Sequence, residues 1–190
     1  MDFIDDSKAL LVGPLAAAEH RSPAGVEESV VALFDELRVP LLRYLSGFPL
    51  GTQDSEDVLQ ETFLALFERL RRGEPHASIR AWIFRVAHNL ALKRQWQVRK
   101  TTQGSAAFAG LERAVADPGP NPEAQYALHQ RQARVLAAIR ALPQQNRLCL
   151  YLRAEGLRYR EIAGILDVSL GSVALYLERA LARIARAAEG

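Results

Sequence analysis

Apolar residues recur three and four positions apart along much of the chain, which is the spacing of one face of an α-helix. Over residues 26–47 this repeat predicts a first helix, in which Pro40 is expected to cause a kink or a break. A second helix is expected over residues 56–72, with the hydroxyl of Ser55 as its N-terminal cap. A third should run over residues 78–99, beginning at a capping serine.

The second half of the chain carries the same repeat in shorter pieces. Helices are expected over residues 123–141, 143–154 and 159–166, and a last helix should begin near Leu170. The middle piece has a proline in its first turn, where a missing backbone N–H is tolerated. Aromatic residues are few, at 7%, and alternating β-branched clusters are missing, which argues against a sheet. The predicted fold class is therefore all-α.

Two segments interrupt the helical pattern and divide the chain. Residues 1–24 form a mixed tail that should be mobile. Residues 101–122 are small, polar and rich in Gly and Pro, which is the composition of a flexible linker. We therefore expect two small helical domains, at residues 25–100 and 123–190, joined by that linker.

The pattern around residues 157–173 is typical of a helix-turn-helix motif. Ala163 is small where two helices should touch, and Ile162 and Ile165 are apolar beneath it. Ser169 is placed to cap the helix that follows. In such motifs the second helix enters the major groove of DNA. The C-terminal domain is therefore predicted to bind DNA, and a helical hairpin without a DNA role is the alternative.

Charge is distributed unevenly, although the net charge is only +2. Residues 54–68 hold five acidic side chains and no basic one, while residues 78–100 hold six basic side chains and no acidic one. Trp82 and Trp96 are interleaved with the cations of the second segment. Cations neutralise phosphates and aromatic rings stack on unpaired bases, so this segment suits separated DNA strands. A solvated charged face above a core is the alternative interpretation.

Several other classes of site are not supported. Cys149 is the only cysteine and has apolar neighbours, so we expect it to be packed in a core. The four histidines lack the spacing of a metal site. Without a Gly-rich phosphate loop or a nucleophile beside a histidine, we expect neither an enzyme nor a cofactor. An acidic start, an early Gly-Pro and the lack of a long apolar run argue against export and a membrane partner, so a cytoplasmic location is expected.

Over about residues 26–188 the order of these segments resembles the bacterial RNA polymerase sigma factors, specifically the extracytoplasmic-function (ECF) type. The string Asp54-Ser-Glu-Asp-Val-Leu-Gln-Glu-Thr-Phe-Leu64 is similar to the family's helix that binds core polymerase. The string Ser78-Ile-Arg-Ala-Trp-Ile-Phe-Arg-Val-Ala-His-Asn-Leu-Ala91 is similar to its promoter-melting helix. Ala141-Leu-Pro143, followed by the helix-turn-helix, resembles the domain that recognises the upstream promoter element.

The resemblance implies a protein without catalytic chemistry that binds core RNA polymerase and directs it to promoter DNA, and it leaves an anti-sigma factor open as a further partner. The expected polymerase contacts are Asp57, Gln60 and Glu61. Residues 72–77 and the basic helix would engage the non-template strand, with a flipped base held by that loop. The candidate DNA contacts are Arg80, Arg85, Asn89, Lys93, Arg94, Ser172, Leu175, Tyr176, Arg179 and Arg183.

The last helix departs from the family's pattern. Leu175 and Tyr176 lie where relatives commonly have basic or polar side chains, so phosphate attraction should be weaker at the end of the helix that enters the groove. Leu175 suits contact with a thymine methyl group and Tyr176 contact with a phosphate, unless both pack on another protein surface. The stripe expected to be buried in this helix is Val173, Leu177, Leu181 and Ile184.

Two other functions compete with the sigma-factor hypothesis. A sigma-like regulatory protein whose C-terminal domain mainly makes protein contacts, with a regulator or with its own first domain, would bind promoters with little salt dependence. A helix-turn-helix repressor with a ligand-sensing N-terminal domain would leave the acidic and basic helices unexplained.

Overall fold

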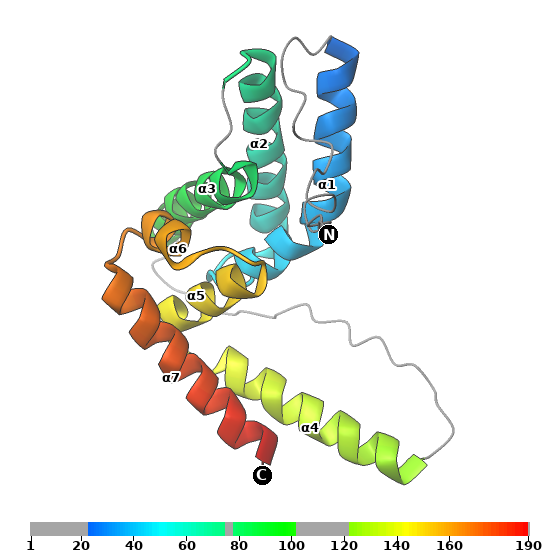
Figure 1. Ribbon diagram of the computed structural model, residues 1–190, viewed down its shortest axis with the longest axis vertical. Helices are drawn as coiled ribbons and strands as arrows, with labels where there is room; N and C mark the ends of the chain where they lie inside the picture. Colours follow the sequence, from blue (N-terminus) through cyan, green and yellow to red (C-terminus); the bar gives the residue numbers. More distant parts are fainter. Residues whose placement is uncertain (1–22, 75–77, 102–121, 190) are drawn as a thin grey trace, which may run out of the picture.

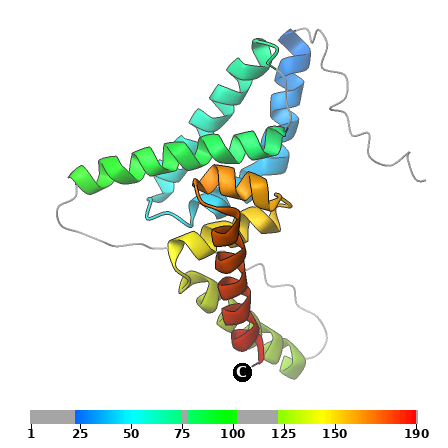
Figure 2. The same cartoon turned by 60° about the vertical axis from the view of Figure 1, so that its left-hand side comes forward.

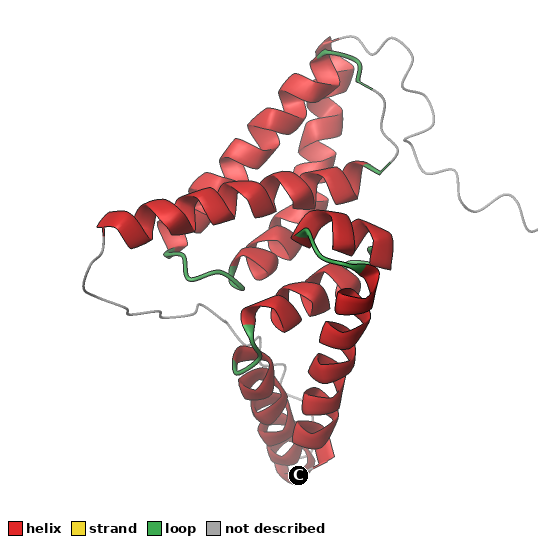
Figure 3. Cartoon of the chain, turned by 90° about the vertical axis from the view of Figure 1, so that its left-hand side faces the viewer, coloured by secondary structure: helices red, strands yellow, loops and turns green. Residues whose placement is uncertain are grey.

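The computed structural model describes residues 23–74, 78–101 and 122–189, and every regular element in those ranges is a helix (Figure 3). Residues 1–22 of the predicted mobile tail and 102–121 of the predicted linker lie outside the described residues, whereas residues 23–24 of that tail belong to the first helix. The all-α prediction is confirmed. The helices are α1 (Pro23–Leu45), α2 (Thr52–Arg71), α3 (Ile79–Thr101), α4 (Pro122–Arg140), α5 (Gln144–Ala154), α6 (Tyr159–Leu166) and α7 (Leu170–Glu189).

The first three helices pack against one another around a shared apolar face. Leu37 and Leu41 of α1 are buried with Val58 of α2 and Ile83 of α3, each at most 1% exposed. Pro40 lies inside α1, which continues past it, and the ribbon changes direction in its light-blue C-terminal part (Figure 1). Of the two predicted outcomes, a kink or a break, the helix therefore shows the kink.

The last four helices form a second group. α4 and α7 run side by side, and α5 and α6 lie between this pair and the first three helices (Figures 1 and 2). Cys149 of α5 is fully buried, as its apolar neighbours indicated. Leu157 and Ile162 are buried beside it, so the helix-turn-helix shares its core with α5.

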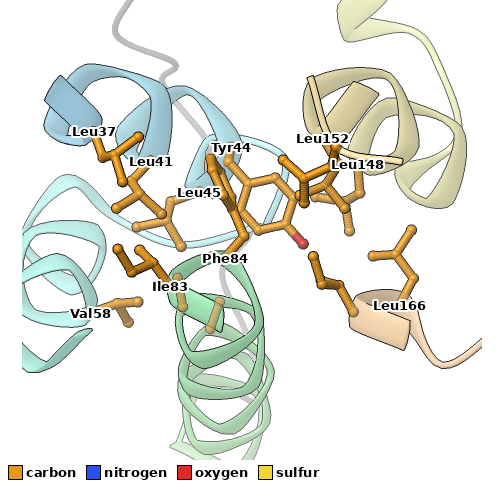
Figure 4. Close-up of a cluster of buried hydrophobic side chains, with 14 of the residues drawn as sticks. Leu37, Leu41, Tyr44, Leu45, Val58, Ile83, Phe84, Leu148, Leu152 and Leu166 are labelled. Carbon is orange, nitrogen blue, oxygen red and sulfur yellow. The ribbon is translucent and has the colours of Figure 1, made fainter. Parts of the chain in front are cut away.

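One hydrophobic core runs through both groups of helices. Tyr44 of α1 and Phe84 of α3 lie in the same cluster of buried side chains as Leu148 and Leu152 of α5 and Leu166 of α6 (Figure 4). Close packing is strictest at Gly47, where an added Cβ would lie 2.6 Å from Cδ2 of Leu148. The two groups are therefore in direct apolar contact.

The start of α2 differs from the prediction. The helix begins at Thr52, after Gly51 in an extended conformation, rather than at Glu56. Ser55 is consequently inside the first turns, where its hydroxyl donates to the carbonyl of Gly51 at 3.0 Å and caps nothing. Polar residues that precede an apolar stripe can lie inside a helix as well as at its start. The predicted start of α2 is therefore about a turn too late.

The buried stripe of α7 also differs from the prediction. Val173 and Leu177 are buried as expected, but the next buried position is Ala180, and Leu181 is 56% exposed. A helix of 3.6 residues per turn moves from 173 through 177 to 180, and a small side chain at 180 allows close approach to α4 and α5. Leu181 is apolar, but its angle around the helix places it outside the buried stripe.

Candidate functional site

The acidic residues of α2 form a row along one side of the helix. Asp57, Gln60 and Glu61 are partly or fully exposed, and Leu64, one turn further on, is 59% exposed in the same arc. The opposite side of α2 is buried through Val58 and other apolar residues. The structure thus brings the three predicted polymerase contacts together in one row, with an exposed leucine at its C-terminal end.

Arg94 of α3 lies against this acidic row. Its Nη2 atom is 3.5 Å from Oδ2 of Asp57 and 3.4 Å from Oε1 of Glu61, and its Nε atom is 3.7 Å from Oδ1 of Asp54. The side chain is 29% exposed, and Gln53 donates a further hydrogen bond to Asp57 at 3.0 Å. One cation therefore partly neutralises the cluster of carboxylates.

The polar residues predicted on α3 divide between two faces. Arg85, Asn89 and Lys93 are exposed and follow one another at four-residue intervals, which places them in one row. Trp96 is 59% exposed at the end of this row, with the Lys100 ammonium 3.6 Å from its ring centroid. This row presents cations beside an aromatic face, the pairing that suits single-stranded nucleic acid.

Arg80 lies on the other face of α3, where it forms ion pairs inside the molecule. Its guanidinium pairs with Glu36 of α1 and, at 3.4 Å, with Oε2 of Glu155 at the end of α5. Arg85, although exposed, lies over α6, since a Cβ on Gly164 would be 2.7 Å from its Nη2 atom. Both side chains therefore reach the C-terminal half, Arg80 at Glu155 and Arg85 at Gly164.

The beginning of α3 is fixed by Ser78, which behaves as predicted. Its hydroxyl accepts the backbone N–H of Ala81 at 3.4 Å. Gly73, at φ +65°, ends α2 in the left-handed conformation that glycine adopts most easily. Of the predicted loop 72–77, residues 75–77 lie outside the described residues.

The helix-turn-helix is formed by α6, a short turn and α7. Asp167 closes α6 in the left-handed conformation, at φ +53°. The Ser169 hydroxyl accepts the backbone N–H of Ser172 at 3.0 Å, so the predicted cap of α7 is confirmed. At the start of α6 the Glu161 carboxylate accepts the N–H of Arg158 at 2.7 Å, and this bond is the main reason for a lowered pKa of Glu161.

The predicted recognition face of α7 occupies a single arc. Leu175, Arg179 and Arg183 are exposed and Ser172 is half-buried, all on the side opposite the buried stripe. Tyr176 is half-buried and packs against the hydrophobic core at the edge of this arc. The structure thus separates Tyr176 from the other four.

The buried titratable groups belong to the core. The Oη atom of Tyr44 lies 2.7 Å from Nδ1 of His88, which is 5% exposed, and burial lowers the pKa of His88 to about 4. Burial raises the pKa of the Cys149 thiol to about 12 and that of Tyr44 well above its usual range. Among the described residues no group of histidine, cysteine and carboxylate side chains could hold a metal ion. These groups are thus neutral parts of the packing.

Two parts of the chain match known protein families, and these parts contain the candidate site residues described above. Residues 33–101 match sigma-70 region 2, and residues 132–184 match sigma-70, region 4. Over 151 residues the chain is 32% identical to the RNA polymerase sigma factor CnrH of Cupriavidus metallidurans, covering 77% of this chain and 79% of CnrH. This chain belongs to the sigma-70 family and is an ECF-type sigma factor.

Other relatives of this sigma factor carry similar names. It is 32% identical to the "ECF RNA polymerase sigma factor SigE" of Mycolicibacterium smegmatis over 80% of this chain and 60% of SigE. It is 35% identical over 135 residues to a Xanthomonas campestris protein described as "Probable RNA polymerase sigma factor RfaY", where 68% of this chain matches. The match spans only 33% of that Xanthomonas protein, a third of its length. CnrH, SigE and the Xanthomonas protein are all described as RNA polymerase sigma factors.

Two solved structures share the fold of this sigma factor. The sigma factor RpoE of Bartonella quintana, solved in complex with the anti-sigma factor NepR, superposes with a TM-score of 0.62 at 19% identity, covering 86% of this chain and 96% of RpoE. CnrH, in complex with the cytosolic domain of CnrY, gives 0.54 at 23% identity over 86% of this chain and 90% of that chain. No helix among the described residues has the length and apolarity needed to cross a membrane.

Sequence reasoning missed the residues that join the two groups of helices. Arg147 of α5 donates to the carbonyl of Gly47 at 2.9 Å, and Glu155 pairs with Arg43 and Arg80. Contacts between residues about a hundred positions apart leave no periodic pattern. The separate orientation of Arg94 could have been predicted from the sequence, because its position on the helix is half a turn away from that of Arg85.

Proposed function

We propose that this sigma factor binds core RNA polymerase through the exposed row of α2 and directs the enzyme to promoters. The observation that supports the proposal most directly is the row of Asp57, Gln60 and Glu61, which continues into the exposed Leu64. An apolar anchor with charges at its rim is the usual composition of an energetically important contact. The partner surface is therefore basic with a central apolar pocket.

The nucleic-acid contacts are proposed on two helices. The row of Arg85, Asn89 and Lys93 on α3, with Trp96 at its end, suits the separated non-template strand. Ser172, Leu175, Arg179 and Arg183 on α7 suit the major groove of the upstream element. Tyr176 has a reduced part in the second site because it packs on the core. Arg80 contributes only after its internal ion pairs open, and Arg94, held by the carboxylates of α2, is assigned no direct contact with DNA.

The remaining assignments follow from the same proposal. Residues 25–100 would form the domain that binds polymerase and melts the promoter, and residues 123–190 the domain that recognises the upstream element. The chain would have no catalytic activity of its own and would act in the cytoplasm, where its polymerase is. An anti-sigma factor is a further partner, supported by the RpoE and CnrH complexes of similar fold.

The polymerase contact is tested with Asp57→Ala and Glu61→Ala combined. The double variant should bind purified core polymerase at least about tenfold more weakly, because charged residues at the rim of an anchor guide and stabilise association. Glu27→Ala with Glu28→Ala removes two exposed carboxylates from α1 and serves as the matched control. Equal affinities of the two double variants, with unchanged helix content by circular dichroism, would refute the assignment.

One observation favours a second candidate function. α5 and α6 pack against α1 and α3, so the C-terminal half makes extensive contacts with protein in this structure. In that alternative, the C-terminal half of a sigma-like regulatory protein mainly serves protein contacts. Promoter binding by the holoenzyme separates the two candidates, because groove binding by α7 predicts a steep loss of affinity with added salt. A shallow salt dependence favours the alternative.

A further inference from the structure

The exposed arc of α7 also holds a carboxylate, that of Glu178. On a helix of 3.6 residues per turn, Glu178 lies about 60° around the axis from Leu175. Both side chains are exposed, and Leu175 is 41% exposed at the centre of the arc. Val173 and Leu177 are buried on the other side of the helix. Glu178 therefore points outward, beside the residues proposed to enter the major groove.

The carboxylate of Glu178 has no cation beside it on α7. Side chains three and four residues apart are neighbours on a helix surface, and adjacent residues are not. The neighbours of Glu178 are all uncharged, namely Ala174, Leu175, Leu181 and Ala182. Among the described residues no ion pair involves Glu178. Because phosphates repel an unpaired carboxylate, its place in a DNA interface requires a hydrogen-bond donor on the nucleic acid.

The neighbouring residues of the arc offer no comparable acceptor. The hydroxyl of Ser172 lies 2.9 Å from that of Ser169, which also caps the helix, so Ser172 takes part in the turn. Leu175 offers apolar contact, and Arg179 has only N–H donors.

The chemistry of a carboxylate selects one base in the major groove. Cytosine presents its N4 amino group there, a donor that a carboxylate accepts. Adenine presents an amino donor beside the N7 acceptor, and this pair matches an amide better than a carboxylate. Glu178 is therefore suited to cytosine.

We propose that Glu178 determines part of the base preference of this sigma factor, by accepting a hydrogen bond from the N4 amino group of a cytosine in the upstream element. The inference rests on the proposed function, because it requires α7 to lie in the major groove. Leu175, which suits a thymine methyl group, is about 4.5 Å from Glu178 along the helix axis. Successive base pairs are about 3.4 Å apart, so the cytosine should lie one or two base pairs from a thymine.

Selection from a library of promoters tests this assignment. Core polymerase carrying the full chain selects from duplexes randomised over the upstream element, and sequencing gives the enrichment of each base at each position. The test variants are Glu178→Ala and Glu178→Gln. Glu189→Gln is the matched control, because it removes the same charge from an exposed position of the same helix about 16 Å further along its axis.

The unaltered chain and Glu189→Gln should favour cytosine at least about fivefold at one position of the element. Glu178→Ala should lose this preference and keep the others. Glu178→Gln should favour adenine at that position, because a glutamine amide pairs with both N6 and N7 of adenine. Glu178→Ala should also bind duplexes without the cytosine more tightly than the unaltered chain does, because a charge that phosphates repel is gone. A purely structural role of Glu178 would produce neither change.

Three results would overturn the assignment of Glu178 and leave the proposed function standing. They are an enriched element in which no position favours cytosine, a cytosine preference that Glu178→Ala retains, and weaker binding of Glu178→Ala to core polymerase with unchanged base preferences. The last result would place Glu178 in a contact with protein. If the unaltered chain enriches no upstream sequence, the proposed role of α7 fails, and the inference fails with it.

Discussion

The Nη2 atom of Arg94 on α3 lies 3.4 Å from Oε1 of Glu61 on α2. This pair joins a residue predicted to contact DNA to one predicted to contact polymerase. Because Arg94 also reaches Asp54 and Asp57, its charge is directed toward α2 rather than toward the exposed row of α3. The two predicted surfaces of region 2 therefore meet at this arginine.

Lys93 and Arg94 are adjacent in sequence but should respond differently to the loss of their charge. Lys93→Gln removes an exposed cation from the proposed strand-binding row, and it should weaken open-complex formation and reduce the dependence on salt. Arg94→Gln should change either quantity less than about twofold and cost less than about 1 kcal/mol of stability, as for other partly exposed pairs. A fluorescent base in the non-template strand reports strand separation. Equal losses in both variants would show that Arg94 contacts DNA directly.

Arg179 and Arg183 are the cations of the proposed recognition face. Arg179→Gln and Arg183→Gln should each reduce the salt slope of upstream-element binding by about 1, because each removes one phosphate contact. Arg131→Gln, at an exposed position of α4, is a suitable control. Filter binding of the holoenzyme at several salt concentrations measures the slopes. Slopes that match the control would remove α7 from the DNA interface.

Leu177 and Leu181 test the orientation of α7. Leu177 is 3% exposed, and Leu177→Ala should cost about 2–5 kcal/mol through lost burial and a cavity. Leu181 is 56% exposed, and Leu181→Ala should cost less than about 0.5 kcal/mol. Urea denaturation gives both free energies of unfolding. If Leu181→Ala lowered the free energy of unfolding more than Leu177→Ala, Leu181 would belong to the buried stripe, as the sequence predicted.

His88 should make stability depend on pH below neutrality. Its pKa is lowered from 6.5 to about 4 on folding, so the unfolded chain binds the proton more tightly. Its contribution to stability is complete above pH 6.5 and is lost as the pH falls toward 4, by about 2 kcal/mol between pH 7 and pH 5. His88→Asn keeps an acceptor for Tyr44 and does not titrate. Denaturant titrations at both pH values should show a smaller loss in this variant, and parallel losses would exclude His88 as the cause.

The helices and most of their buried faces could be predicted from the sequence, because a repeat of 3.6 residues records which side is buried. The bounds of α6 and the cap at Ser169 were both predicted correctly, because both depend on residues that are close in sequence. The start of α2 was misplaced because Gly51 carries no side-chain signal for a cap.

The parts that failed or were missed depend on distant neighbours. Leu181 was expected to be buried because it is apolar, but it is 56% exposed among the described residues. The ion pairs of Arg80 could not be predicted, since Glu36 and Glu155 lie far from it in sequence. The local sequence pattern therefore predicts the helices, whereas the contact between the two groups of helices is visible only in the structure.

The central claim is that this chain is a sigma factor that directs core polymerase to promoters. Its most direct test is in vitro transcription of genomic DNA by purified bacterial core polymerase with and without the chain, followed by mapping of the transcript 5′ ends. The account predicts start sites that appear only with the chain and share sequence elements at fixed distances upstream. Transcripts that begin at the same places with and without the chain would contradict it.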